Sequence, residues 1–193
     1  MILPVLKYGH PVLRQKGARV DQITPPIRKL VDDMLETMRH ASGIGLAAQQ
    51  VGHALQLTVI DVTGVKDRPS TLEVDGRAAD LADHMPLVLI NPELTPLGES
   101  VAGPEGCLSF PEVFAEIARP GSVEVRAMNE KGRKVEFRCS GLLARAVQHE
   151  TDHLNGILFI DRMTPDTKKD LKAELEALYA ATRSELKGRP PNQ

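Results

Sequence analysis

Two histidines and a glutamate in the string HETDH, at residues 149–153, have the spacing of a metal-binding helix. Residues 142–154 contain neither Gly nor Pro and carry apolar side chains at helical spacing, which predicts a helix. Residues four apart share one face of a helix, so His149 and His153 can bind the same metal ion. Glu150 lies one step round the helix, where it can act as general base on a metal-bound water. The alternative is a solvent-exposed helix with two unrelated histidines.

A catalytic zinc-like site normally has three protein ligands, so a third ligand must come from elsewhere. Downstream of the predicted helix the nearest candidates are Asp161, Asp166 and Asp170, and the extended HEXXHXXGXXH pattern is absent. Upstream, Cys107 stands among small residues in EGCLS (105–109), at an expected turn. A thiolate is a strong ligand for Zn²⁺ or Fe²⁺. A small buried cysteine without a ligand role is the alternative.

The string GIGLAAQQVG (43–52) is rich in small residues and follows a predicted helix. It is not a dinucleotide-binding fingerprint, because Ala48 occupies the place of the last glycine in GXGXXG and no strand precedes it. Small residues let a ligand approach the backbone closely. An amide side chain beside them can donate a hydrogen bond to a developing oxyanion. A simple helix-capping turn is the alternative.

The composition is that of one globular domain. The chain has 193 residues, of which 41% are hydrophobic and 26% charged. A net charge of −2 gives no reason to expect specific binding to DNA. No apolar run reaches the roughly 18 residues that span a bilayer, and the start resembles neither a signal nor a transit peptide, so we expect no membrane partner and a cytoplasmic location. Two cysteines are too few for a disulfide framework.

Hydrophobic periodicity predicts the elements that must position these residues. A helix is expected at 27–41, after Thr24-Pro25-Pro26, and another from Thr164-Pro165-Asp166 to Gly188. Strands are expected at 55–62, 87–97, 122–128 and 134–138. Pro92 indicates an edge or a bulge in the second of them, and residues 129–133 form a hairpin between the last two. Residues 63–85 are polar and are expected to leave the core.

These elements predict an α+β fold. A mainly antiparallel β-sheet would pack around a central metal-binding HEXXH helix, with an N-terminal helix and a C-terminal helix. No alternation of strand and helix indicates a parallel sheet.

Three strings in this order resemble the peptide deformylase family. GIGLAAQQ (43–50) matches its GXGXAAXQ motif, EGCLS (105–109) its second motif, and HETDH (149–153) its HEXXH motif. YGHPVLRQ (8–15) is similar to the family's opening segment. The resemblance covers residues 1–165, the implied catalytic domain, with the polar excursion at 63–85. Residues 166–187 are expected to form a C-terminal helix of the same domain, and 188–193 a tail.

The resemblance implies a metal-dependent hydrolase that removes the formyl group from the N-terminal formyl-methionine of new polypeptides and releases formate. It implies Cys107, His149 and His153 as the metal ligands, with water as the fourth. Glu150 is the implied general base and later the acid. The side-chain amide of Gln50 and the backbone N–H of Leu108 are the implied donors to the oxyanion.

The resemblance also implies which residues receive the methionine side chain and the peptide backbone. These substrate-binding residues are Ile44, Gly45, Gly106, Leu142, Arg145 and Ala146. Of these, Arg145 lies one turn before His149 on the same helix face. We expect its aliphatic stem to be packed and its guanidinium to lie in water. The alternative is that the guanidinium lies at the edge of the substrate pocket.

The expected cofactor is one divalent metal. The ligand types allow Zn²⁺, Ni²⁺ or Co²⁺, and the resemblance implies Fe²⁺ in cells. The implied partners are N-formyl-methionyl nascent peptides and, through the C-terminal helix, the ribosome. The basic residues of that helix region are Lys168, Lys169, Lys172, Arg183, Lys187 and Arg189. The alternative for this helix is that it only packs on its own core. Two rival functions are a zinc endopeptidase and a non-catalytic, ribosome-associated binding module.

Overall fold

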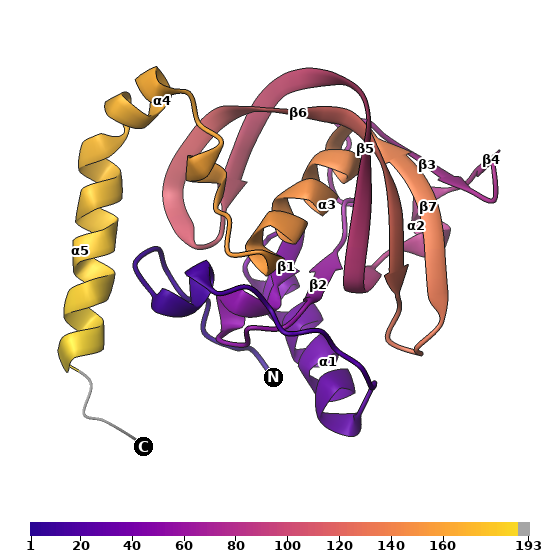
Figure 1. Cartoon of the computed structure of the whole chain (residues 1–193), viewed down its shortest axis with the longest axis horizontal. Helices are drawn as coiled ribbons and strands as arrows, with labels where there is room; N and C mark the ends of the chain where they lie inside the picture. The colour runs from indigo at the N-terminus through magenta and orange to yellow at the C-terminus, as the bar shows by residue number, and fades with distance from the viewer. Residues whose placement is uncertain (189–193) are drawn as a thin grey trace.

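A seven-stranded antiparallel sheet and a central helix organise the computed structural model, which describes residues 1–188 (Figure 1). The strand order is β1-β2-β5-β6-β7-β3-β4, and every named pair of strands is antiparallel. The strands are β1 (Gly45–Ala47), β2 (Leu57–Ile60), β3 (Ser70–Val74), β4 (Arg77–Ala78), β5 (Leu87–Cys107), β6 (Phe110–Met128) and β7 (Lys134–Ser140). The prediction of an α+β fold with a mainly antiparallel sheet is confirmed.

Helix α3 (Gly141–Leu154) carries the HETDH string and lies inside the curve of the sheet (Figure 1). It contacts strands β1, β2, β3, β6 and β7. Leu143 and Val147 are fully buried against fully buried strand residues such as Ile60 and Val123. Each such side chain contributes roughly 1.5–3 kcal/mol by leaving water, so the sheet holds this helix firmly.

The long hairpin of β5 and β6 is the main feature that the sequence patterns did not predict. One strand was expected to end at residue 97 and the next to begin at residue 122. In the structure β5 extends to Cys107, and β6 begins at Phe110. Only Leu108 and Ser109 lie between them. The second half of β5 could not be predicted from the residue pattern, because positions 96–106 contain several Pro and Gly residues, and both types are depleted in strands. The pairing also shifts register between Ile90 and Glu93, as expected of a bulge at Pro92.

The polar segment at 63–85 joins the sheet instead of leaving the core. Strand β3 pairs with β7, β4 pairs with β3, and a short helix α2 (Leu81–His84) follows. The side chain of Ser70 accepts a hydrogen bond of 2.9 Å from the backbone N–H of Leu143. This segment therefore caps the start of α3, while the side chain of the local N-cap residue, Ser140, does not.

The two ends of the described chain lie outside the sheet (Figure 1). The C-terminal helix contacts the N-terminal segment, where Tyr179 lies against Tyr8. Helix α1 (Pro25–His40) confirms the predicted N-terminal helix, and short 3₁₀ segments lie at Pro11–Arg14, Ala48–Val51 and Phe159–Asp161. The predicted single C-terminal helix is two helices, α4 (Pro165–Asp170) and α5 (Lys172–Gly188), which Leu171 separates. Arg189 and the rest of the predicted tail lie outside the described residues.

Candidate metal centre and active site

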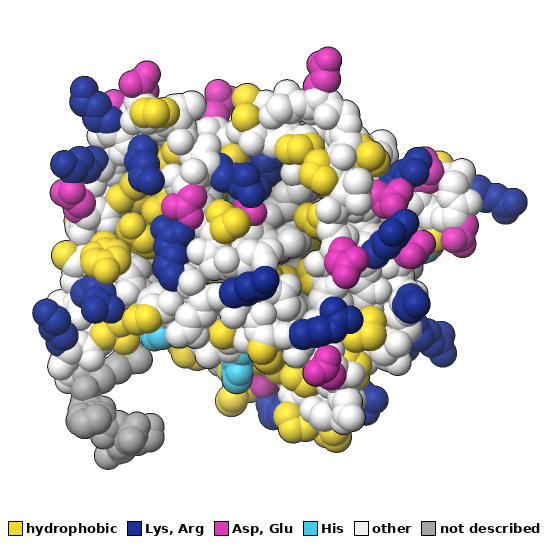
Figure 2. Space-filling view, viewed as in Figure 1, with side chains coloured by type: hydrophobic (Ala, Val, Ile, Leu, Met, Phe, Trp, Pro, Cys, Tyr) yellow, Lys and Arg dark blue, Asp and Glu magenta, His cyan; other side chains and the backbone are white. Residues whose placement is uncertain are grey.

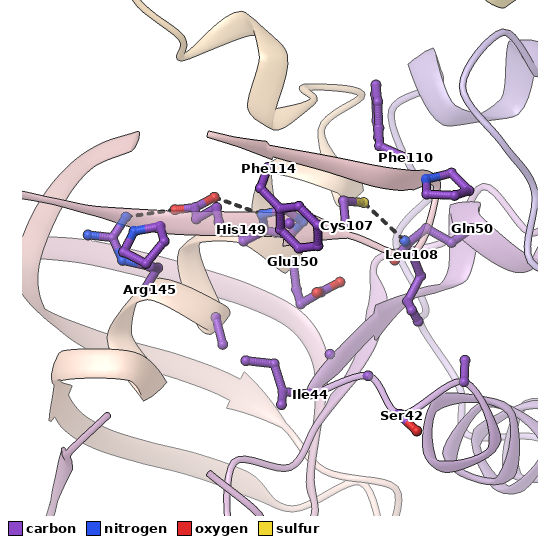
Figure 3. A pocket seen from close by; sticks show the side chains of 18 of the residues that line it. Ser42, Ile44, Gln50, Cys107, Leu108, Phe110, Phe114, Arg145, His149 and Glu150 are labelled. Carbon is purple, nitrogen blue, oxygen red and sulfur yellow. Dashed lines mark hydrogen bonds and ion pairs between the residues drawn. The ribbon is translucent and has the colours of Figure 1, made fainter. Parts of the chain in front are cut away.

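A cysteine and two histidines converge at the junction of the β5–β6 hairpin and α3. Figure 3 shows two of them, Cys107 and His149, at the cavity. Cys107 is the last residue of β5, and α3 supplies His149 and His153. The Cys107 Sγ atom lies 3.3 Å from Nε2 of His153, and one ligand atom from each of the three residues lies within 4.8 Å of the others. Ligands of a tetrahedral zinc-like ion are about 3.5 Å apart. This donor set therefore fits a divalent metal, with thiol and imidazole groups that suit Fe²⁺ or Zn²⁺.

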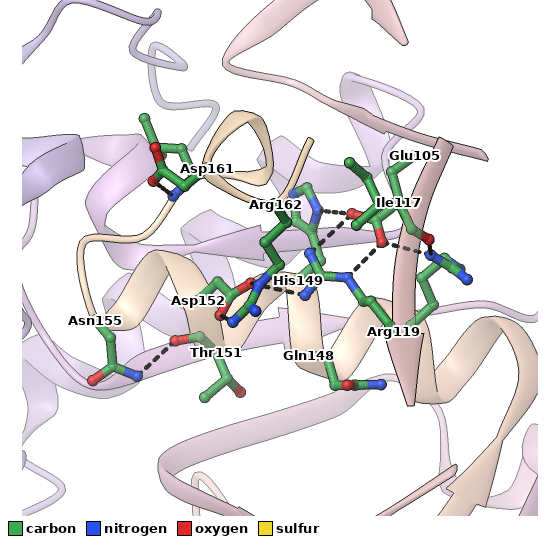
Figure 4. Close-up of polar contacts among 12 residues, drawn as sticks. Glu105, Ile117, Arg119, Gln148, His149, Thr151, Asp152, Asn155, Asp161 and Arg162 are labelled. Atoms are coloured by element: carbon green, nitrogen blue, oxygen red, sulfur yellow. Dashed lines mark hydrogen bonds and ion pairs between the residues drawn. The ribbon is translucent and has the colours of Figure 1, made fainter. Parts of the chain in front are cut away.

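A buried carboxylate orients the first histidine (Figure 4). Oε2 of Glu105 lies 2.9 Å from Nδ1 of His149, and Arg119 and Arg145 both pair with the same carboxylate. Arg119 in turn contacts Asp152 at 2.8 Å. Because Nδ1 of His149 is engaged, its Nε2 is the nitrogen left to face Cys107.

His149, Glu150 and His153 of α3 have different electrostatic surroundings. Burial lowers the pKa of His149, but the hydrogen bonds with Cys107 and Glu105 outweigh it and raise the value to about 10. Burial, together with the nearby charge of His149, lowers the pKa of His153 well below its usual value. Burial raises the pKa of Glu150 to about 7. A metal-free site at neutral pH therefore holds one charged and one neutral imidazole.

The Glu150 carboxyl group is buried, and one of its oxygens, Oε2, has no hydrogen-bond partner within residues 1–188. The carboxyl group lies against Gly45 of strand β1: a Cβ atom at that glycine would lie 2.3 Å from Oε1 of Glu150. A carboxyl group with a pKa of about 7 can both accept and donate a proton at neutral pH.

Gln50 points its amide nitrogen at the metal centre. Its Oε1 accepts a hydrogen bond of 2.9 Å from the backbone N–H of Ala47, which leaves the NH₂ group to face the other way. That nitrogen lies 3.5 Å from Cys107 Sγ and 3.2 Å from Ser109 Oγ. Gln49, by contrast, turns its amide toward Leu154 at the back of the site.

These residues open into a cavity of about 580 Å³. That volume is typical of a pocket for a small ligand. Leu108 lines the cavity beside Cys107. All six residues that the sequence assigned to the substrate line it too: Ile44, Gly45, Gly106, Leu142, Arg145 and Ala146.

Comparison with known proteins assigns the family. The sequence model of polypeptide deformylases matches residues 2–169. This chain belongs to the peptide deformylase family. It is 46% identical over 178 residues to the peptide deformylase of Methylacidiphilum infernorum, covering 92% of this chain and 93% of the relative. It is 42% identical over 192 residues to that of Opitutus terrae, covering 98% and 100%.

Solved structures agree with the assignment to the deformylases. A single-residue mutant of peptide deformylase 1B from Arabidopsis thaliana superposes with a TM-score of 0.82 at 35% identity, covering 99% of this chain and 98% of the other. A peptide deformylase from Legionella pneumophila superposes with a TM-score of 0.78 at 31% identity, and the match covers 99% of this chain and 100% of the other. The protein is thus a metal-dependent hydrolase that removes the N-formyl group of nascent peptides.

The prediction that the Arg145 guanidinium of this deformylase lies in water is wrong, whereas the alternative place at the edge of the pocket agrees with its position in the cavity lining. Its guanidinium does not extend into water but donates to the carbonyl oxygens of Val101 at 2.8 Å and Ile117 at 2.7 Å, and to Glu105 at 2.9 Å. The side chain is only 11% exposed. The cause is the unpredicted extension of β5 and β6, whose hairpin covers this part of α3 and surrounds the guanidinium with acceptors.

Sequence reasoning missed several residues at the deformylase site. Glu105 lay inside a recognised motif, and its place beside Cys107 could have indicated a supporting role. Lys7, Arg68 and Phe114 also line the cavity, although no motif marked them. Arg119 gave no signal, because it meets Glu105 only through the strand pairing.

Within residues 1–188, no helix of the deformylase combines the length and hydropathy needed to cross a membrane.

Proposed function

We propose that Cys107, His149 and His153 bind one divalent metal ion and that Glu150 transfers the protons during hydrolysis of the formyl group. When bound, the metal supplies a positive charge that polarises the formyl carbonyl and makes water more acidic. The proposal is supported by the short separation of the three donor atoms and by the fit of thiol and imidazole groups to such an ion. We propose Fe²⁺ as the ion in cells, with Zn²⁺, Ni²⁺ or Co²⁺ as substitutes.

Glu150 accepts a proton as water attacks the formyl carbon. The new C–O bond gives a tetrahedral intermediate with a negatively charged oxygen. Gln50, through its side-chain amide, and Leu108, through its backbone N–H, donate hydrogen bonds to that oxygen. Glu150 then gives its proton to the departing nitrogen, and the C–N bond breaks to leave formic acid and a free amine. Formic acid loses its remaining proton to the amine, so formate and a protonated N-terminus are released. The unpartnered carboxyl oxygen of Glu150 at the cavity is the observation that carries this assignment.

Replacement of Glu150 tests the proposal. We expect Glu150→Gln to keep its metal, because the ligands are untouched, and to lose about 10²–10⁴-fold in turnover of a formyl-Met peptide. Formate release and metal content are measured on anaerobically purified protein. Near-normal turnover would refute the general-base role. Cleavage of an unformylated peptide at an internal bond would favour the endopeptidase rival, and metal binding without formate release would favour the binding module.

The metal ligands have a separate test. We expect Cys107→Ala to lose metal on dialysis, because one of three anchoring groups is gone, whereas Cys139→Ala leaves the metal content unchanged. Cys139 is the matched control because its thiol is buried in the sheet core, away from the site. Equal metal content in the two variants would contradict the ligand assignment.

We propose that the substrate's methionine enters the cavity lined by Ile44, Gly106 and Leu142, and that residues 1–165 form the catalytic domain. A cytoplasmic location belongs to the same proposal, since formylated chains emerge from ribosomes there.

Contact of the C-terminal helices with the ribosome is also proposed. Lys168, Lys169, Lys172, Arg183 and Lys187 are exposed, although acidic side chains intermix with basic ones over α4 and α5 (Figure 2).

Co-sedimentation with ribosomes tests that contact. We expect a variant with Lys168 and Lys169 changed to glutamate to bind less than the unmodified protein. A variant with Lys131 and Lys134 changed to glutamate, on the distant β6–β7 hairpin, is the control. Equal binding of all three proteins would count against the contact.

A further inference from the structure

The N-terminal segment 6–8 lies directly behind two of the three motif strings. The backbone N–H of Leu6 donates to the carbonyl of Gln50 at 2.8 Å, and the N–H of Tyr8 donates to the carbonyl of Ser109 at 2.9 Å. One short segment thereby links Gln50, the last residue of the first motif string, to Ser109 at the tip of the β5–β6 hairpin. The side chain between these two contacts is that of Lys7, which points into the cavity.

Lys7 holds the carbonyl of Leu108 from inside the cavity. Its Nζ donates to that oxygen at 2.7 Å. Leu108 is one of the two turn residues between β5 and β6, so its carbonyl is not part of the strand ladder. The lysine contact therefore fixes the turn that also presents the Leu108 N–H.

The ammonium charge of Lys7 is not neutralised by a neighbouring carboxylate. In the described part of the chain, no Asp or Glu forms an ion pair with it. The side chain is half-buried, and this loss of water lowers the pKa of Lys7, while the nearby Cys107 opposes the shift. A half-buried cation without a carboxylate partner, beside a site where negative charge develops, stabilises that charge more than it would in water.

We propose that Lys7 is a positioning residue for oxyanion stabilisation: its ammonium fixes the Leu108 turn and places a positive charge near the forming oxyanion. The inference rests on the proposed function of Leu108 as a donor. It predicts that the chemical step depends on Lys7 more than substrate binding does, because the oxyanion exists only during the reaction.

Three substitutions of Lys7 separate its charge, its hydrogen bond and its bulk. Lys7→Met keeps the apolar stem but removes both charge and donor, Lys7→Gln keeps a donor without charge, and Lys7→Arg keeps both. We expect Lys7→Met to lower kcat about 10–100-fold, less than the loss of a direct oxyanion donor, with KM changed by less than about threefold. Lys7→Arg recovers most of kcat and Lys7→Gln only part. Lys16→Met is the control, because Lys16 is exposed, and it leaves kcat unchanged.

A binding measurement gives a readout that does not depend on turnover. Formate, the anionic product, is titrated into the Co²⁺-loaded protein and followed by the cobalt absorption spectrum. We expect formate to bind about tenfold more weakly to Lys7→Met than to the unmodified protein, with unchanged Co²⁺ content and melting temperature. Unchanged kcat and formate affinity in Lys7→Met would overturn the inference. A lower kcat in Lys7→Met that is accompanied by loss of bound metal or by a lower melting temperature would also overturn the inference. The role of Lys7 would then be structural.

The outcomes also distinguish this inference from the proposed function. If the unmodified protein releases formate and Glu150→Gln does not, but Lys7→Met behaves like the unmodified protein, only the role of Lys7 fails. If Glu150→Gln retains turnover, the proposed function fails whatever Lys7 does.

Discussion

Oε2 of Glu105 lies 2.9 Å from Nδ1 of His149, and this contact decides which imidazole nitrogen faces Cys107. Glu105 is itself fixed by two guanidinium groups, since both Arg119 and Arg145 pair with its carboxylate. A carboxylate behind a ligating histidine typically holds the ring in one tautomer and raises its basicity. In the proposed metal site, the position of His149 therefore depends on residues outside the three donors.

Removal of the Glu105 charge should weaken metal binding. We expect Glu105→Gln to lower the affinity for Co²⁺ about 10–100-fold, because the neutral amide holds the imidazole less firmly and removes the negative charge that pairs with Arg119 and Arg145. Competition with a chelator measures the affinity. Glu116→Gln, at an exposed position of β6, is the control and should bind as tightly as the unmodified protein. Equal affinities for the two variants would show that Glu105 does not support the ligand.

The same carboxylate should make stability depend on pH in the metal-free protein. Burial by itself raises the pKa of Glu105, but the hydrogen bonds from His149 and Arg119 outweigh it and lower the value from 4.5 to about 2. A depressed folded-state pKa stabilises the fold above about pH 4.5, and this contribution is lost as the pH falls toward 2. The shift corresponds to about 3 kcal/mol.

Comparison with Glu105→Gln isolates that contribution. We expect the free energy of unfolding of the unmodified protein to fall relative to the variant when the pH is lowered from 6 to 3, because only the unmodified protein has this group to protonate. Urea denaturation at the two pH values measures the difference. A difference that does not change with pH would mean that the pKa of Glu105 is not depressed.

Local patterns predicted the elements whose structure depends on local sequence. Helix α1 followed from apolar spacing after a Pro-containing start, and the β6–β7 hairpin from the Gly132 turn. The clustering of Cys107 with the two histidines was reached through motif resemblance, and its geometry is now visible in the donor distances. Helix α1 and the β6–β7 hairpin need no knowledge of distant partners, whereas the cluster joins residues that are far apart in the sequence.

Contacts between distant residues account for what the sequence could not predict. Glu105 meets Arg119 only because β5 and β6 pair over their full length, across Pro and Gly residues that weaken the strand pattern. Arg145 is surrounded by backbone acceptors for the same reason. The polar segment at 63–85 was expected outside the core because few of its residues are apolar, yet strand edges and helix caps need backbone and hydroxyl groups rather than hydrophobicity.

Ser70 tests the structural role of that segment. It caps α3 from 73 residues away in the sequence, so Ser70→Ala should lower the free energy of unfolding by about 1 kcal/mol. Ser140→Ala is the comparison, since Ser140 occupies the N-cap position without a capping side-chain bond and should cost less. Chemical denaturation gives both values. A larger loss at Ser140 than at Ser70 would contradict the distant cap.

Metal uptake should release at least one proton from His149. Its pKa of about 10 in the metal-free protein means that the ring is charged at pH 7, and a ligating imidazole must give up the proton on Nε2. Calorimetric titration with Co²⁺ in two buffers of different ionisation enthalpy measures the release. Identical heats in both buffers would show that no net proton leaves. We also expect the affinity to rise by at least about tenfold for each pH unit gained below the pKa of His149, since each proton released contributes a factor of ten.

The absence of a side chain at Gly45 is predicted to be required for the reaction. Gly45 is buried in β1, and an added Cβ would lie 2.3 Å from Oε1 and 2.8 Å from Cγ of Glu150. No real contact is that short, so Gly45→Ala must displace the carboxyl group. A displacement of about 1 Å at a catalytic group costs on the order of 10²-fold in rate, and we expect this loss in kcat with the metal content unchanged. Gly64→Ala is the matched control, because nothing lies within 4 Å of a Cβ at that position. If Gly45→Ala turned over formyl-Met peptide as fast as Gly64→Ala, the carboxyl position would not limit the reaction, and the general base would have to be sought elsewhere.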